Sequence, residues 1–436
     1  MFRPMTLLAR RSTMRCFSTS KTPPNAPIMP ALDYTPPPYT GPSKAEVMAT
    51  RRAHMSPAQV TLYGDDPFLM ASGYMQYAFD EENRRYLDLF GGIVTVGVGH
   101  AHPRTVKAAY EQMQRVSHTC TLYLNDQTTM YTKELADRLP DHLSSVFVVN
   151  SGSEANDLAA LLARLYTGNS TMMSVRNGYH GMSGTSMGLT QHGSWKYNVP
   201  APANMITTAA PNMYRGQFRL SDGLTPEECT DRYVADVAEV LAHSVSSTGM
   251  AGFVCEPIHG VGGTIDLPPG YLDRVYKLIR GAGGVCIADE VQTGFARTGS
   301  HYWGFERAGV LPDIVVMAKS IGNGAPLAAV ATTPEIAATL ARASYFNTYG
   351  GNPVSSAIGR EVLRIIDDEG IQRNCAERGE QYLTGLRKLQ AKYPTNIGDV
   401  RGAGLMLGLE LVTDPETKEP NAKLCTDTIN RARDYG

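Results

Sequence analysis

An aspartate and a lysine each follow a short apolar run in the second half of the sequence. The run Val285–Ala288 leads to Asp289, and the run Ile314–Ala318 leads to Lys319. Each run has the composition of a buried parallel strand, and the segment between them is long enough for a crossover connection. Ligands bind at the carboxyl ends of strands in open α/β sheets, so we expect Asp289 and Lys319 at one binding edge.

These two residue types suit one cofactor in particular. A desolvated lysine amine can attack an aldehyde, and a carboxylate can keep a pyridine nitrogen protonated. Pyridoxal phosphate requires both groups. A structural ion pair explains Asp289 and Lys319 equally well, because a buried carboxylate is costly without a cationic partner.

The segment Ser144–Tyr166 has the pattern of a phosphate site. It reads as a strand (SSVFVVN), a turn of small residues (SGSEAN) and an amphipathic helix (DLAALLARLY). N–H groups at a helix N-terminus attract anions, Gly152 allows close approach, and the Ser153 hydroxyl adds a donor. An ordinary helix cap is the alternative. Tyr179, in the later triplet YHG, is an aromatic residue able to stack on a flat ring.

The elements that must position these residues alternate along the chain, as in α/β proteins. The predicted strands cover residues 144–150, 252–255, 285–288, 314–318, 328–332 and 404–412. The predicted helices cover residues 44–54, 157–166, 231–242, 272–280, 334–343, 354–368 and 371–393.

Composition argues against several classes of function. The 436 residues are 42% apolar, enough for more than one domain with a large core. A net charge of −2 gives no indication of nucleic-acid or membrane-surface binding, and no apolar run approaches the roughly 18 residues of a transmembrane helix. The seven cysteines are scattered without a CxxC pair, which predicts free thiols. His100 and His102 form an HxH pair without further ligands at useful spacing, so we expect no metal site.

The N-terminus has the composition of an organelle-targeting peptide. Four arginines and several Ser and Thr residues fall within residues 1–20, and no acidic residue precedes Asp33. This pattern predicts a mitochondrial or plastid transit peptide, and Arg15–Ser18 resembles a mitochondrial processing site. A disordered basic tail is the alternative. Residues 21–43 are rich in proline and predict an extended linker.

Six motifs carry a resemblance to a known family. They are SGSEAN, YHG, ADEVQTGFARTG, MAKSIGNG, TYGGNP and VRGAGLM, in this order. Their order and spacing over residues 45–436 resemble the class-III, or subgroup-II, aminotransferases among the fold-type-I pyridoxal-phosphate enzymes.

The resemblance implies a fold and a domain plan. It implies an α/β fold whose large domain has a mostly parallel seven-stranded sheet flanked by helices, with a smaller α+β domain from both chain ends. The large domain is expected at residues 101–345, and the small domain at 44–100 and 346–436. Family members usually continue past this end, so we expect the small domain to be truncated. The resemblance also implies a homodimer or homotetramer with shared active sites.

Roles for individual residues follow from the resemblance as well. Lys319 would bind the cofactor aldehyde and act as the general acid–base, and Asp289 would pair with the ring nitrogen. The other cofactor contacts would be Gly152 and Ser153 on the phosphate, Tyr179 and Val291 on the ring faces, Gln292 on the phenolic oxygen, and Thr348 of the neighbouring subunit on the phosphate. Arg401 would bind a substrate carboxylate, and Glu256, near Gln292, would be a second substrate residue.

Val261 bears on the substrate class. Ornithine- and acetylornithine-type relatives read EPIQGE, where the second glutamate can cover the substrate arginine, whereas this chain reads EPIHGV. Because valine cannot form an ion pair, we expect Arg401 to be free unless a different residue screens it. A free Arg401 favours transamination from alanine, or a small donor such as β-aminoisobutyrate, to glyoxylate or pyruvate. The N-terminal composition places this reaction in the mitochondrial matrix. His259 replaces the more usual glutamine of this motif.

Three alternatives remain open on the sequence alone. One is another class-III aminotransferase, acting on ornithine or 4-aminobutyrate. The second is a pyridoxal-phosphate mutase or decarboxylase on the same scaffold, which would need no external oxo acid. The third is a non-catalytic homologue, which the intact catalytic positions disfavour.

Overall fold

The computed structural model describes residue 23 and residues 25–64, 66–200 and 202–436. These residues divide into two compact units. The first holds the described residues up to Ser72, with Phe79–Leu87 and Lys423–Gly436; the second holds Gly73–Ala78 and Asp88–Ala422. The transit peptide predicted for residues 1–20 lies outside the described residues. The domain boundaries expected from the sequence stay a prediction.

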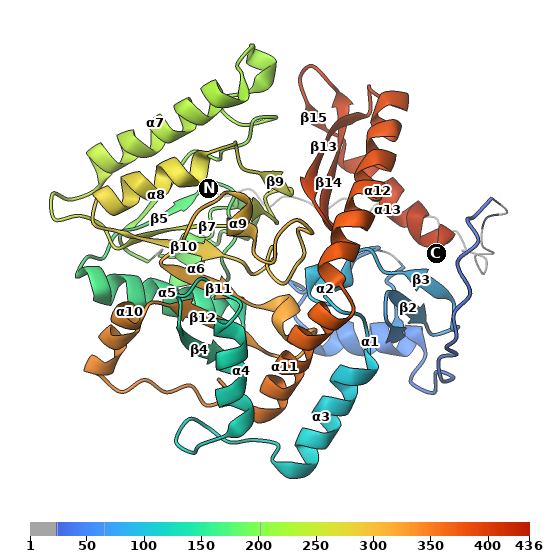
Figure 1. The fold of residues 1–436 in the computed structure, drawn as a ribbon. Coiled ribbons are helices and arrows are strands. Elements are labelled where there is room, and N and C mark those ends of the chain that lie inside the picture. The colour runs from blue at the N-terminus through green and yellow to red at the C-terminus, as the bar shows by residue number, and fades with distance from the viewer. Residues whose placement is uncertain (1–22, 24, 65, 201) are drawn as a thin grey trace, which may run out of the picture. The chain divides into compact units, whose positions relative to one another are not determined.

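A seven-stranded sheet forms the centre of the second unit, in the order β4-β12-β11-β10-β7-β5-β6 (Figure 1). Its strands are β4 (Ser145–Val149), β5 (Met172–Val175), β6 (Met205–Thr208), β7 (Gly252–Cys255), β10 (Val285–Asp289), β11 (Ile314–Met317) and β12 (Ala328–Thr332). The strand β12 is antiparallel to β11 and β4, and every other pairing in the sheet is parallel. The mostly parallel seven-stranded sheet expected from the resemblance is therefore confirmed.

Helices and smaller sheets make up the rest of the regular structure. The α-helices are α1 (Lys44–His54), α2 (Gly91–Val94), α3 (Pro103–Arg115), α4 (Asp126–Ala136), α5 (Gly152–Thr167), α6 (Gly184–Leu189), α7 (Pro226–Ser244), α8 (Tyr271–Gly281), α9 (Gly304–Arg307), α10 (Pro334–Ala338), α11 (Pro353–Asp368), α12 (Ile371–Lys392) and α13 (Ala422–Tyr435). The remaining strands are β1 (Met70–Tyr74), β2 (Tyr77–Asp80), β3 (Arg85–Leu87), β8 (Ile258–His259), β9 (Ile265–Asp266), β13 (Ile397–Ala403), β14 (Met406–Asp414) and β15 (Glu419–Pro420).

Two apolar clusters cover the two faces of the seven-stranded sheet, because successive side chains of a strand point to opposite faces. Along β11, Ile314 and Val316 belong to one cluster, and Val315 and Met317 belong to the other. The first cluster packs the sheet against α5, and the second packs it against α8 on the opposite face (Figure 1). Burial on both faces fixes the strand ends, where the candidate residues lie.

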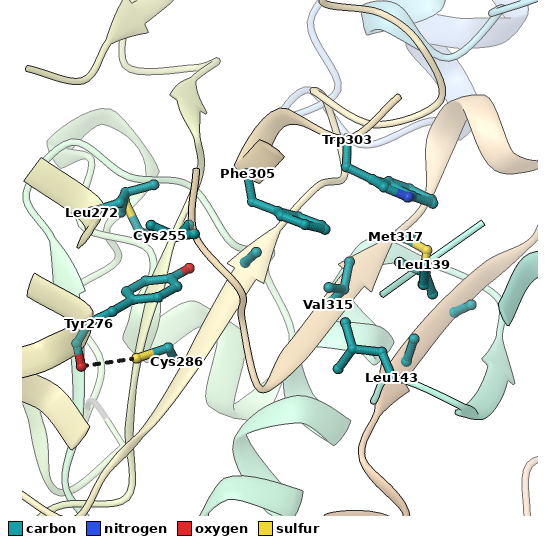
Figure 2. Packing of buried hydrophobic residues seen from close by; sticks show 14 of the residues in the cluster. Leu139, Leu143, Cys255, Leu272, Tyr276, Cys286, Trp303, Phe305, Val315 and Met317 are labelled. Carbon is teal, nitrogen blue, oxygen red and sulfur yellow. Dashed lines mark hydrogen bonds between the residues drawn. The ribbon is translucent and has the colours of Figure 1, made fainter. Parts of the chain in front are cut away.

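The second cluster contains the largest buried side chains of this unit. Figure 2 shows Tyr276 of α8 beside Cys286 of β10, and Trp303 and Phe305 on the same side of the sheet as Met317. The thiol of Cys286 donates to the Tyr276 carbonyl at 3.8 Å. All six cysteines in the described part of the chain are free.

Most predicted elements are confirmed, one local prediction is wrong, and one strand has no counterpart among the predictions. The strands β7 and β12 have the predicted bounds, whereas the turn expected at SGSEAN is the first turn of α5. The helix begins early because the Ser151 hydroxyl caps it, accepting from the Glu154 N–H at 3.2 Å. The strand β13 was not predicted, because IGDVRGA lacks the alternation of a half-buried strand. It forms by antiparallel pairing with β14.

Two further expectations concern membranes and metals. No helix of the described residues is long and apolar enough to cross a membrane. The two histidines of the HxH pair have separate carboxylate partners. His100 Nε2 lies 2.7 Å from Asp88, and His102 Nε2 lies 3.0 Å from Glu369.

Candidate active site

Eight of the ten site residues predicted from the sequence line one cavity of about 310 Å³, here called the Lys319 cavity. They are Gly152, Ser153, Tyr179, Glu256, Asp289, Val291, Gln292 and Lys319. They come from the N-terminus of α5 and from the carboxyl ends of β5, β7, β10 and β11 and the segments that follow them. The expected binding edge of the sheet is therefore the place where these side chains meet.

Asp289 ends β10 and is only 2% exposed. Its Oδ2 accepts from the Asn156 amide at 2.9 Å and lies 2.7 Å from His180 Nδ1. Its Oδ1 accepts from the Val291 N–H at 3.1 Å. The carboxylate is thus fixed in orientation by three partners inside the core, and it does not need Lys319 as a counter-ion.

His180 makes the shortest contact with this carboxylate. Burial by itself lowers the pKa of His180, but the hydrogen bond to Asp289 and the negative charge of Asp289 offset it and raise the pKa above its ordinary value. The other ring nitrogen, Nε2, is buried without a hydrogen-bond partner among the described residues. The raised pKa of His180 thus reflects its contact with the Asp289 carboxylate.

Lys319 follows β11 and opens a short 3₁₀ turn, with a left-handed φ of 55°. This conformation is uncommon for a residue with a side chain and costs energy, which is typical of functional positions. Burial lowers the pKa of the Lys319 amine, the charges of Asp289 and Glu256 act in the opposite direction, and Arg297 lowers it further. The amine is therefore a stronger nucleophile near neutral pH than an exposed lysine.

The N-terminus of α5 provides an anion site on the wall of the cavity. The N–H groups of Gly152 and Ser153 belong to the first helical turn, where N–H groups have no partner within the helix. A Cβ atom on Gly152 would lie 3.2 Å from the Val291 side chain, so a larger residue would crowd the cavity. The Ser153 hydroxyl accepts from the Met182 N–H at 3.2 Å, which leaves its own proton for a ligand.

Glu256 is a buried carboxyl group in the same cavity. Its Oε1 accepts from the Tyr179 N–H at 3.0 Å, and its Oε2 accepts from the Gly260 N–H at 2.8 Å. Burial raises its pKa to about 7, although His180 and these two N–H groups act against the rise. The Gln292 side chain packs against Gly260, so Glu256 and Gln292 are near neighbours. The Tyr179 ring is half-buried and meets Trp195 edge-on at 5.2 Å between ring centroids.

Arg401 and Thr348 are not brought to the Lys319 cavity within this chain. Thr348 lies on an exposed loop before α11 and lines no described cavity. Arg401 lies on β13, and the expectation that it is free is wrong. Its guanidinium is bonded to Asp399, Glu410 and the Gly263 carbonyl. The alternative allowed from the sequence, that a residue other than position 261 screens Arg401, is what the structure shows.

Val261 lines a second cavity of about 580 Å³, which shares Gln292 with the first. This Val261 cavity is also bounded by Gly260, Thr264, Arg297 and the segment Leu405–Leu407. The Gln292 side chain therefore lies between the two cavities.

The Lys319 cavity fits the three polar ends of pyridoxal phosphate. The helix N-terminus of α5 suits the phosphate, Asp289 suits the ring nitrogen, and Lys319 suits the aldehyde. Among the described residues, Asp289 Oδ1 accepts one hydrogen bond, from the Val291 N–H at 3.1 Å, so the carboxylate can still accept another from a protonated ring. The residues present therefore fit the group.

His180 and Asn156 are functional residues that the sequence reasoning missed. Both contact Asp289. His180 lies in the family motif YHG and Asn156 in SGSEAN, but only other residues of these motifs were assigned functions from the sequence. For His180, a polar side chain beside Gly181 was the available signal, and for Asn156 there was none beyond its place in SGSEAN. His259 is fully buried, and burial lowers its pKa to about 3. Its neutral ring lies 3.6 Å from the Cys255 thiol, which gives the change from glutamine a packing explanation.

Comparison with known proteins agrees with this geometry. A family model described as aminotransferase class-III matches residues 66–436. The chain is 46% identical to alanine–glyoxylate aminotransferase 2 homolog 2, mitochondrial, of Arabidopsis thaliana, over 94% of the chain and 83% of that protein. It is 44% identical to the mitochondrial alanine–glyoxylate aminotransferase 2 of Homo sapiens, over 90% of the chain and 79% of that protein.

Solved structures show the same architecture. An (S)-enantioselective omega-transaminase from Thermomicrobium roseum superposes with a TM-score of 0.81 at 34% identity, covering 88% of each chain. A phospholyase from Arthrobacter, in complex with phosphoethanolamine, has a TM-score of 0.81 at 33% identity, covering 89% of this chain and 90% of that one.

Proposed function

This chain belongs to the class-III aminotransferases and is a pyridoxal-phosphate enzyme, and we propose that it transfers the amino group of alanine, or a similarly small donor, to glyoxylate or pyruvate. The observation that supports transamination is the meeting of Lys319, Asp289 and the α5 N-terminus in one cavity. The names of the relatives and the valine at position 261 support the small substrates.

Each residue of the Lys319 cavity has a place in this proposal. The bound cofactor supplies an electron-accepting ring. Asp289 would keep a proton on the ring nitrogen, and Gly152 and Ser153 would hold the phosphate. Tyr179 and Val291 would restrain the ring faces, and Gln292 would contact the phenolic oxygen. The Lys319 amine, whose pKa is lowered by burial, would take the proton from the substrate α-carbon and later return it.

Arg401 and Glu256 are the proposed substrate residues. A planar guanidinium binds a carboxylate through two parallel hydrogen bonds, which would fix the α-carbon over Lys319. Burial raises the pKa of Glu256 to about 7, so a fraction of the molecules carries a proton there at neutral pH and can donate it to a substrate oxygen. Arg401 would hold the carboxylate of an amino or oxo acid, and Glu256 would hold another of its oxygen atoms.

We also propose a homodimer in which Thr348 of the partner subunit completes the phosphate site. Large apolar side chains of α3, namely Val106, Tyr110 and Met113, are exposed at helical spacing, and the loop residues Leu122–Leu124 are exposed as well. Exposed apolar surface of this extent is typical of an interface. Sedimentation equilibrium of the wild type is expected to give a dimer or larger, and Tyr110→Asp is expected to give monomer with weakened cofactor binding.

The proposed location is the mitochondrion. The relatives carry this location in their names, and the first 20 residues have the composition of a transit peptide. N-terminal sequencing of the native protein is expected to show removal of roughly the first 20 residues. An intact Met1 on protein recovered from the cytosol would contradict the proposal.

A coupled assay across donors and acceptors tests the substrate class. The donors are alanine, β-aminoisobutyrate, ornithine, 4-aminobutyrate and phosphoethanolamine, each with glyoxylate, pyruvate, 2-oxoglutarate or no oxo acid. Turnover that requires both alanine and an oxo acid supports the proposal. Turnover without an oxo acid, or phosphate release from phosphoethanolamine, would instead indicate lyase, mutase or decarboxylase chemistry.

A further inference from the structure

The contacts of Arg401 form a small network with two carboxylates and a second arginine. Arg401 Nη1 donates to Asp399 Oδ2 at 2.8 Å and to Glu410 Oε2 at 2.6 Å. Its Nε and Nη2 donate to the Gly263 carbonyl at 2.9 and 2.7 Å. Glu410 Oε1 accepts from Arg215 Nε at 2.6 Å. All three nitrogens of Arg401 are therefore engaged by the chain itself.

The pairing of β13 with β14 explains why these charges meet. Asp399 and Arg401 are two residues apart on β13, so their side chains lie on one face, and Asp399 is paired with Glu410 across the sheet. Arg401 is paired with Gly408, and a Cβ there would lie 3.5 Å from Arg401 Cγ and 3.2 Å from the Gly263 carbonyl. Glycine at position 408 leaves room for the guanidinium to reach Gly263.

This network lies beside the Val261 cavity and not in it. Gly260, Val261 and Thr264 line that cavity, whereas Arg401 lines neither cavity, and its side chain is 14% exposed. A guanidinium that is to bind a substrate carboxylate there must first leave the Gly263 carbonyl and loosen at least one carboxylate. The substrate carboxylate and Glu410 are therefore competitors for one cation.

We propose that Glu410 is a specificity-determining residue, which opposes the binding of substrate carboxylates by holding Arg401 in the β13–β14 network. The inference rests on the proposed role of Arg401 as the carboxylate receptor. Because position 261 is a valine, no carboxylate at that position pairs with Arg401. Glu410 on β14 pairs with Arg401 instead. Of the two carboxylates, Glu410 is the stronger candidate because it makes the shorter contact and is itself oriented by Arg215.

Two donors that differ only in the carboxylate separate this role from general damage. Alanine and isopropylamine have the same skeleton, with a methyl group in place of the carboxylate. Glu410→Gln keeps the size of the side chain and removes its charge. It is expected to lower the KM for alanine about fivefold, the size of a modest ion-pair contribution, with kcat and the isopropylamine half-reaction unchanged within about twofold.

Matched variants make the comparison specific. Glu419→Gln removes an equal charge from an exposed position on β15 and is expected to leave both donors unaffected. Glu410→Asp withdraws the carboxylate by one methylene and is expected to lower the KM for alanine by a smaller factor. If Glu410→Gln fails to fold, Glu410→Asp carries the test. In a chain that carries Arg401→Met, Glu410→Gln is expected to change nothing.

The outcomes are distinguishable from failure of the proposed function. A wild type that transaminates no carboxylate donor defeats the alanine–glyoxylate proposal. A wild type that uses alanine, with an unchanged or raised KM in folded Glu410→Gln, overturns the role of Glu410. An equal change for alanine and isopropylamine overturns it too, because a purely structural role would affect both donors.

Discussion

The Lys319 cavity and the Arg401 network treat their cations in opposite ways. The Lys319 amine has no hydrogen bond or ion pair within the described part of the chain, and burial lowers its pKa. The Arg401 guanidinium has every nitrogen bonded. Asp289, the carboxylate whose charge acts most strongly on Lys319, already accepts from Asn156 and the Val291 N–H and contacts His180.

The difference follows from what each cation has to do. A group that reacts must reach its target without first breaking an ion pair, so the core around Lys319 satisfies Asp289 separately. A group that only binds can be held by internal partners, because a substrate carboxylate can take the place of an internal carboxylate. The internal partner then determines which ligands compete successfully.

Removing the reactive cation should have the largest effect. Lys319→Ala is expected to lower kcat for alanine by at least about 1,000-fold, because it deletes both the attachment point and the acid–base group. It should also abolish the visible absorbance that survives dialysis in the wild type. Lys277→Ala, at an exposed position on α8, is the control. Normal turnover by Lys319→Ala would contradict the whole assignment.

Replacing Asp289 should have the second largest effect on kcat. Asp289→Asn keeps the size of the side chain and loses the charge that holds a proton on the ring nitrogen, so kcat is expected to fall roughly 100-fold or more. Some cofactor should be retained, because the α5 N-terminus still binds the phosphate. His180→Asn should produce a smaller loss of the same kind. Equal rates for Asp289→Asn and the wild type would remove Asp289 from the mechanism.

Glu256 makes the Lys319 cavity sensitive to pH. Burial raises its pKa to about 7 in the folded protein, above its value in the unfolded chain, so the folded state binds a proton more tightly. Its contribution to stability is complete below pH ~4.5 and is lost as the pH rises through about 7. Glu256→Gln should reduce the fall in unfolding free energy of the apoprotein between pH 5 and pH 8 by roughly 1–3 kcal/mol.

Urea unfolding at several pH values measures this difference. Glu416→Gln, at an exposed position after β14, is the control and should leave the pH dependence as in the wild type. An identical pH profile for Glu256→Gln and the wild type would show that Glu256 titrates normally.

The smallest expected effect concerns the wall of the Val261 cavity. The wild type should prefer alanine with glyoxylate over ornithine with 2-oxoglutarate by about tenfold in kcat/KM, or 1.4 kcal/mol. Val261→Glu adds a third carboxylate near a guanidinium that already has two, so it should weaken alanine use only about threefold. Val261→Leu controls for the change in size. Ornithine turnover equal to that of alanine in the wild type would show that position 261 does not set the substrate class.

The sequence by itself determined the parts of the site that local patterns encode. The runs ending at Asp289 and Lys319 are buried strands, and eight of the ten predicted residues line one cavity, because parallel strands place their carboxyl ends at the same edge. Family motifs added Val291, Gln292 and Thr348, which no local pattern would have singled out.

Tertiary structure decided the partners of each charge. Asp289 contacts Asn156 and His180, which are more than 100 positions away in the sequence, and no local sequence pattern predicts these contacts. The strand β13 exists because β14 pairs with it, and that pairing sets Glu410 beside Arg401. An ion pair across a sheet depends on which side chains lie on the same face of neighbouring strands. The strand register that decides this is set only when the two strands pair.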